Sequence, residues 1–148
     1  MIIPAGDTSF DINLPVIDDL LDEPDEDVVI TLGTPTGAVL GSNTVHTATL
    51  TDNDAPPQVE FSVVSASSLE SAGTATVTVS LDAASGQNVT VPFVVSGTAA
   101  NPADMDLASG SAVVTAGSTS VDISFTIVDD TIDEADETVI LTMGAPTN

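Results

Sequence analysis

Two runs of carboxylates, 111 residues apart, are the groups in this chain best able to do chemistry. The run at 127–143, IVDDTIDEADETVILTM, holds six acidic residues within nine positions, and the run at 16–32, VIDDLLDEPDEDVVITL, repeats the pattern. Neither run contains Lys or Arg. Ionised carboxylates this close together repel each other, and their pKa values rise unless a cation lies among them. The spacing is therefore typical of a site for a hard cation.

Calcium is the cation that such loops suit best. It takes roughly six to eight oxygen ligands from carboxylates, carbonyls and water, whereas Mg²⁺ prefers fewer protein ligands. Zinc and copper favour imidazole or thiolate, and the chain has one His and no Cys. The alternative is a solvated acidic turn, as in salt-adapted proteins. The in-register repetition of the acidic pattern favours a metal site, although neither run matches an EF-hand loop.

The charge of the whole chain restricts its partners. The 148 residues include 23 Asp and Glu, no Lys or Arg, and 42% hydrophobic residues, so the net charge is −23. The apolar content excludes a disordered acidic tail. Nucleic acid is excluded because nothing is available to neutralise phosphate, and no apolar run is long enough to insert into a membrane. With one His, no Cys, no Trp and no Tyr, we expect no enzyme activity.

Strand patterns surround both acidic runs. Runs rich in Val, Ile and Thr, alternating or continuously apolar, are separated by turns rich in Gly, Ser and Asn. They predict an all-β fold, an antiparallel immunoglobulin-like β-sandwich with Greek key topology. Pro15 predicts an edge or a bulge in its strand. The expected strands are 10–17, 27–32, 46–51, 59–64, 75–81, 89–95, 111–115, 121–128 and 138–143, with residues 1–3 forming the middle of another.

An internal repeat divides the chain. Residues 5–36 align without a gap to residues 116–147, and about half of the positions are identical. A period of about 110 residues is that of one β-sandwich domain. We therefore predict that residues 1–55 are the C-terminal part of one repeat, and that residues 56–148 are most of the next repeat without its closing strand. Because Met1 aligns within an apolar run, we expect a segment of a longer array.

The repeat resembles the Calx-beta domain. The resembling features are GTA followed by an Asp in SGTAANPADMDL, a Gly-turn strand pair, and VDDTIDEADETVILTM. At the end of the first repeat, HTATLTDND is similar to the closing strand of the family with its acidic triplet. The resemblance covers essentially the whole chain and implies a calcium-binding β-sandwich.

The resemblance also implies which residues bind calcium, mostly through carboxylates and twice through a backbone carbonyl. In the second repeat the implied ligands are Glu70, Asp104, Asp129, Asp130, Ile132, Glu134 and Glu137, with Asp106 as a further candidate. In the first repeat they are Asp18, Asp19, Leu21, Glu23, Glu26, Asp52, Asn53 and Asp54. Asn53 replaces one acid of the family, so the first site has a lower ligand charge. In the second repeat, Met105 follows Asp104 where the family often has Tyr. Neither set is complete within its own repeat.

We expect an extracellular or cell-surface structural repeat of a fibre, adhesin or matrix protein. Calcium ions would stiffen its loops and the joints between repeats or subunits. The expected partners are calcium, neighbouring repeats or identical subunits, which could add a strand to the open sheet edge at 138–148. The alternative is a calcium-ordered module that recognises a carbohydrate or a protein. Cytoplasmic calcium regulation is a third reading, against which the tandem array and the absence of Lys and Arg argue.

Overall fold

A computed structural model describes all residues from 1 to 148. The chain forms two compact units. Unit 1 consists of Met1–Leu20 and Asp25–Thr51, and unit 2 of Leu21–Pro24 and Asp52–Asn148. No helix in the structure is both long and apolar enough to span a membrane.

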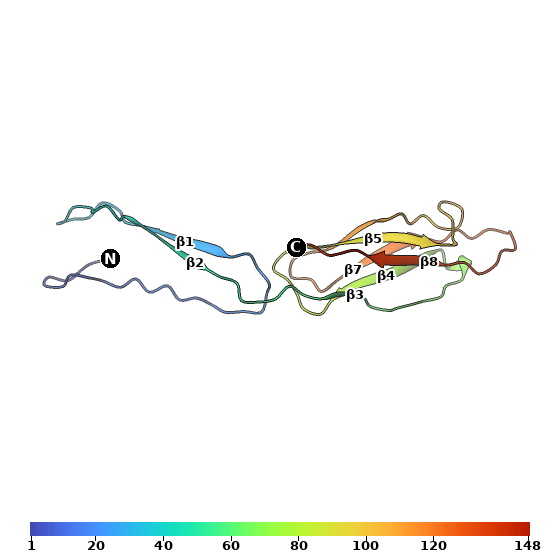
Figure 1. Ribbon diagram of the computed structural model, residues 1–148, viewed down its shortest axis with the longest axis horizontal. Coiled ribbons are helices and arrows are strands. Elements are labelled where there is room, and N and C mark those ends of the chain that lie inside the picture. The colour runs from blue at the N-terminus through green and yellow to red at the C-terminus, as the bar shows by residue number, and fades with distance from the viewer. The chain divides into compact units, whose positions relative to one another are not determined.

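Unit 2 is a sandwich of two three-stranded antiparallel sheets (Figure 1). One sheet has the order β3-β4-β7 and the other the order β6-β5-β8. The chain crosses between the sheets from β4 to β5, from β6 to β7 and from β7 to β8. These crossings are those of an immunoglobulin-like sandwich, and the predicted fold class is confirmed. The elements are β3 (Val59–Phe61), the 3-10 turn η1 (Glu70–Ala72), β4 (Thr74–Leu81), β5 (Val89–Gly97), β6 (Gly110–Val114), β7 (Ser120–Thr126) and β8 (Val139–Met143).

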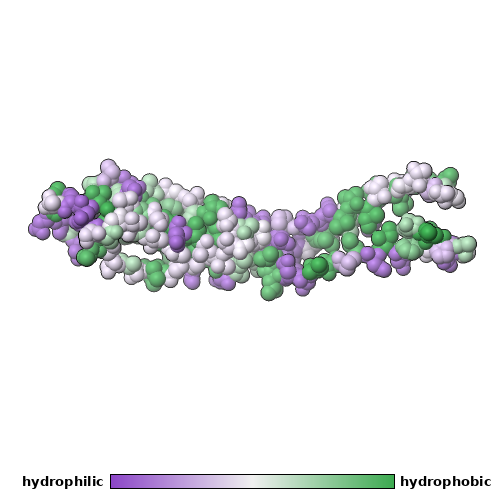
Figure 2. Space-filling view, turned by 180° about the vertical axis from the view of Figure 1, so that it is seen from behind, coloured by the Kyte–Doolittle hydropathy of each residue, from purple (hydrophilic) through white to green (hydrophobic).

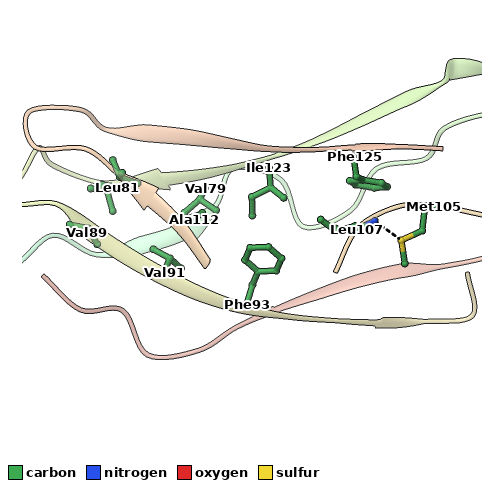
Figure 3. Packing of buried hydrophobic residues seen from close by; sticks show 11 residues of the cluster. Val79, Leu81, Val89, Val91, Phe93, Met105, Leu107, Ala112, Ile123 and Phe125 are labelled. Carbon is green, nitrogen blue, oxygen red and sulfur yellow. Dashed lines mark hydrogen bonds between the residues drawn. The ribbon is translucent and has the colours of Figure 1, made fainter. Parts of the chain in front are cut away.

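Alternating residues build the core between these sheets. In β4 and β7 the inward positions hold Val79 and Ile123, and they face Val91 and Phe93 of β5 (Figure 3). Val79, Val91 and Phe93 are less than a tenth exposed. The intervening Thr and Ser residues of β4 and β7 face outward, because successive side chains of a strand point to opposite faces. Burial of these side chains supplies the main driving force for folding unit 2.

Unit 1 is a two-stranded antiparallel sheet of β1 (Glu26–Thr31) and β2 (Val45–Leu50). It has no second layer, and apolar side chains lie at its surface (Figure 2). Ile17 is 91% exposed and Val39 is 93% exposed. A shallow open groove runs beside the sheet, between Phe10 and Ile12 on one side and β1 and β2 on the other.

Two predicted strands of unit 1 are absent. The strand expected at 10–17 is wrong, and so is the one expected at residues 1–3, because both segments lie outside regular structure. The sequence equivalent of 10–17 in the second repeat forms β7, which pairs with β4. Unit 1 contains no equivalent of β4, and an unpaired segment cannot satisfy the hydrogen bonds of a strand. The other predicted strands are present, with shifted ends.

Candidate metal centre

Five predicted ligands from three separate segments lie within electrostatic range of one another at one end of unit 2. The 3-10 turn η1 carries the first of them, and it ends at Gly73, whose φ of 72° reverses the chain into β4. The loop after β5 carries the second, and the long loop between β7 and β8 carries the other three. The five residues are Glu70, Asp104, Asp130, Glu134 and Glu137.

Two hydrogen bonds fix Asp104, one within its own loop and one to the segment that follows β7. The Ala100 N–H donates to a carboxylate oxygen of Asp104 at 2.5 Å, and the Val128 N–H donates to the Asp104 carbonyl at 2.9 Å. The next residue, Met105, is 5% exposed and packs into the core. Met105 thus occupies an inward position, where an apolar side chain anchors the loop, and Asp104 is half-buried beside it.

Desolvation, followed by the interactions among these carboxylates, raises two pKa values. Desolvation raises the pKa of Glu134 above its ordinary value, and the charges of Asp104, Asp130 and Glu70 raise it further. Desolvation also raises the pKa of Glu137, together with a hydrogen bond to Asp104 and the charges of its neighbours. No Lys or Arg exists in the chain to offset this repulsion. The cluster therefore has the donor chemistry of a hard dication site.

The other predicted ligands of the second repeat are placed differently. Asp106 accepts the Thr126 N–H at 2.6 Å, and this bond lowers the pKa of Asp106. The Ile132 N–H donates to the Asp130 carboxylate at 2.6 Å, and the Ile132 side chain is exposed. Asp129 is exposed and lies three residues beyond the end of β7. No three acidic or histidine side chains in the chain converge into a formed coordination shell.

The predicted ligands of the first repeat are divided between the two units. Asp18, Asp19 and Glu26 belong to unit 1, and the others belong to unit 2. Within unit 2, the Glu23 N–H donates to a carboxylate oxygen of Asp52 at 3.0 Å. This bond joins the segment Leu21–Pro24 to the acidic triplet at residues 52–54. The remaining members in unit 2 are Leu21, Asn53 and Asp54.

Asp22 is a buried structural residue that the sequence analysis missed. It is 7% exposed, the only acidic residue of the chain that is buried. Its carboxylate accepts the Ser85 hydroxyl at 3.1 Å and the side-chain amide of Asn148, and its carbonyl accepts the Gly86 N–H at 3.0 Å. These contacts fix Leu21–Pro24 to the end of the sandwich opposite the cluster described above. Its counterpart 111 residues later, Asp133, is exposed.

Comparisons with known proteins agree with this architecture. The family model described as Calx-beta domain matches residues 2–54 and residues 52–148. Among solved structures, one titled "Crystal structure of CBD12 from CALX1.2" is similar, with 24% identity and a TM-score of 0.53. The match covers 88% of this chain and 52% of that chain, so this chain spans about half of its length. A comparison with curated proteins found no match.

Proposed function

The chain belongs to the Calx-beta family, a family of non-catalytic β-sandwich modules, and we propose that it is a calcium-binding structural repeat. One observation carries the proposal: carboxylates from three separate segments lie within electrostatic range of one another at one end of unit 2, without any cationic side chain. Charge of one sign gathered in this way destabilises the fold at neutral pH. A bound dication would neutralise the repulsion among the carboxylates and cross-link the loops that carry them. The family match supports calcium as the ion.

The proposed ligands are the residues named from the resemblance. Asp104 is held from the β5 side, whereas Asp130, Glu134 and Glu137 share one long loop. Calcium when bound would supply a centre of positive charge between these segments. We propose that this fixes the loops of an extracellular fibre, adhesin or matrix protein and stiffens the joints between its repeats.

A calcium titration of unfolding tests the proposal. Thermal unfolding of the full chain is followed in EGTA, in millimolar calcium, and in NaCl of matched ionic strength. An ion that binds only the folded state adds about 2.7 kcal/mol at one hundred times its dissociation constant. A midpoint that follows ionic strength and ignores calcium would contradict the proposal and favour a solvated acidic turn.

Matched variants locate the effect. The double variant Glu134→Gln with Glu137→Gln removes two proposed ligands, and we expect it to abolish the calcium shift. The control is Asp133→Asn with Asp136→Asn, which makes the same charge change in the same loop at two exposed residues outside the proposed ligand set. The control should keep most of the calcium shift. Equal losses in both would mean that calcium only screens the loop.

A recognition module is the second candidate, and the outer face of β4 and β7 favours it. Polar residues face outward in register on both strands, with Thr76 opposite Ser124 and Thr78 opposite Asp122. The first pair is hydrogen-bonded at 3.1 Å and the second at 2.6 Å. Such a flat hydroxyl-rich face suits a carbohydrate or a protein surface. The test measures binding to a glycan panel by the full chain, by the Thr76→Val variant and by the full chain in EGTA. Binding that Thr76→Val leaves unchanged and EGTA abolishes would exclude this face as the binding surface.

A further inference from the structure

The outer face of the sheet β6-β5-β8 is apolar and uncharged. Successive side chains of a strand point to opposite faces, and in these three strands the residues between the core positions face solvent. Val94 is 60% exposed, Ile140 50% and Val113 40%. None of the three strands contains Asp or Glu, in a chain that has 23 of them. We call the exposed apolar residues of this face the apolar stripe: Pro92, Val94, Val113 and Ile140.

The strand register arranges these residues along one diagonal. Val113 of β6 lies opposite Thr90, near the start of β5, and Ile140 of β8 lies opposite Ser96, near its end. The two stripe residues of β5 lie between these levels, so the apolar stripe crosses the sheet from β6 to β8. Hydroxyl side chains border it on both sides: Thr90, Ser96, Ser111 and Thr142. An apolar centre with a polar rim is the usual composition of a protein–protein interface.

The exposure of the apolar stripe is a property of the sheet. β5 is the central strand, with β6 on one side and β8 on the other. Val94 is paired with Thr142 of β8, so its exposure follows from the direction of its side chain, away from the core. The position of Ile140 is held in the first repeat, 111 residues earlier, by Val29, which is 59% exposed. An exposed aliphatic residue therefore recurs at this position of the repeat.

The outer face of the other sheet is different, because it carries acidic side chains. Glu60 of β3 and Asp122 of β7 both point outward. Two copies packed through that face would bring carboxylates together without any Lys or Arg to offset them. The chain carries a net charge of −23, so copies repel each other wherever acidic surfaces meet. Of the two sheet faces of unit 2, the face with the apolar stripe opposes contact between copies least.

We propose that the apolar stripe is a contact between two copies of this chain, packed sheet against sheet. Exposed apolar area of this kind marks an interaction surface. Charge selects the occupant: a cationic partner would bind the carboxylates on the rest of the surface, whereas a neutral face suits an occupant that carboxylates repel. Another copy, with its charge of −23, is such an occupant. Sheets packed in this way lie about 10 Å apart with their facing side chains interdigitated.

The apolar stripe also matches itself. An isologous two-fold contact brings the same patch of both copies together. Each end of the stripe is a β-branched aliphatic residue, Val113 or Ile140, and Pro92 and Val94 lie between these ends. The order of side-chain types is therefore the same from either end. The stripe of a second copy can lie along it in the reverse direction with apolar residues in contact throughout.

The size of the face predicts a weak contact. Three strands about 4.8 Å apart, over the roughly 20 Å from Thr90 to Ser96, give about 300 Å² on each copy. A stable dimer of standard size buries about 800 Å² per partner. We therefore expect a dissociation constant on the order of 100 µM for one pair of copies. Tandem repeats would strengthen the contact through multivalency.

Sedimentation velocity of the full chain tests the contact. Samples from about 10 µM to about 1 mM are run in EGTA, with NaCl at about 0.1 M and about 1 M. We expect the average mass to rise with concentration toward that of a dimer, and the dissociation constant to fall at least about fivefold at the higher salt. The higher salt shortens the Debye length from about 10 Å to about 3 Å and so screens the repulsion between copies. EGTA makes the result independent of the proposed calcium site.

One outcome of this measurement would overturn the proposal. A chain that stays monomeric at the highest concentration in the higher salt does not associate through this face, and the apolar stripe would then belong to a partner of different sequence.

Matched variants locate the contact. Val94→Asp places a carboxylate at the centre of the apolar stripe and should weaken dimerisation at least about tenfold, since each copy then presents a charge to the other. The control Val64→Asp makes the same change at a fully exposed residue outside the strands, and it should weaken dimerisation less than about twofold. Equal effects of the two variants would overturn the assignment of the contact to this face.

A milder variant keeps the test decisive if Val94→Asp unfolds. Val94→Thr preserves the β-branched shape and removes apolar area, so it should weaken dimerisation about threefold. Thermal unfolding establishes that each variant is folded. A dissociation constant that Val94→Thr leaves unchanged would contradict the proposed contact.

Discussion

Replacing Asp22 by Ala should destabilise unit 2 by about 2 kcal/mol. The substitution removes a buried carboxylate that accepts the Ser85 hydroxyl and the Asn148 amide. A hydrogen bond to a charged group contributes about 1.5–3 kcal/mol, and desolvation of the carboxylate offsets part of the sum. Ser85 is not left without a partner, because its hydroxyl also lies 3.3 Å from the Asp22 carbonyl. The Gly86 N–H keeps its bond as well.

Urea and thermal unfolding of the full chain in EGTA measure this loss. For a unit of about one hundred residues, 2 kcal/mol lowers the unfolding midpoint by roughly 8–10 °C. Asp133→Ala is the matched control, because it makes the same change at the repeat-equivalent residue, which is exposed. The control should stay within about 0.5 kcal/mol of the parent. Ser85→Ala should couple to Asp22→Ala by at least about 0.5 kcal/mol in a double-mutant cycle. Equal losses for Asp22→Ala and Asp133→Ala would refute the reasoning.

Three further predictions concern the carboxylates and one glycine. The pKa values of Glu134 and Glu137 are raised above 4.5. The stability that these two residues contribute is therefore present below pH 4.5 and is lost as the pH rises through their folded pKa values. Urea unfolding in EGTA should show this loss, and the variant with both Glu134→Gln and Glu137→Gln should lack it. The pKa of Asp106 is lowered below 3.8, so its contribution is present above that value and lost as the pH falls through its folded pKa; Asp106→Asn should flatten this acid limb of the same titration. Gly97→Ala would place a Cβ 2.0 Å from the Thr138 carbonyl oxygen at a φ of 128°. Calorimetry should therefore show a loss of about 3 kcal/mol in the free energy of unfolding. In the control Gly110→Ala, the nearest atom to the new Cβ is 3.7 Å away, and stability should change by less than about 0.5 kcal/mol.

The sequence predicted strands well where their partners are present. The alternation in 75–81 and 89–95 matches β4 and β5 closely, because each strand pairs with a neighbour in unit 2. The same kind of alternation at 10–17 gave no strand. Periodicity reports which face of a strand is apolar, but it does not report whether another strand lies beside it.

The candidate site was predictable only in part. The acidic loop is visible in the sequence, whereas its meeting with Glu70 and Asp104 depends on the sandwich and was expected only through family resemblance. Asp22 was not predictable. Its neighbours in sequence are nearly those of Asp133, yet one residue is buried against Ser85 and the other is exposed. The difference arises from tertiary docking, which local sequence does not encode.

The docking of Asp22 also orders events during synthesis. Ser85 follows Asp22 by 63 residues. This contact therefore cannot form until the ribosome has added Ser85, after the residues of β1 to β4. The hairpin partners of β1 arrive much sooner, and its short loop closes at a lower entropic cost. The segment Leu21–Pro24 is therefore followed by a hairpin that can form before its own binding place in unit 2 exists. A nascent chain arrested before Ser85 would expose that carboxylate to water.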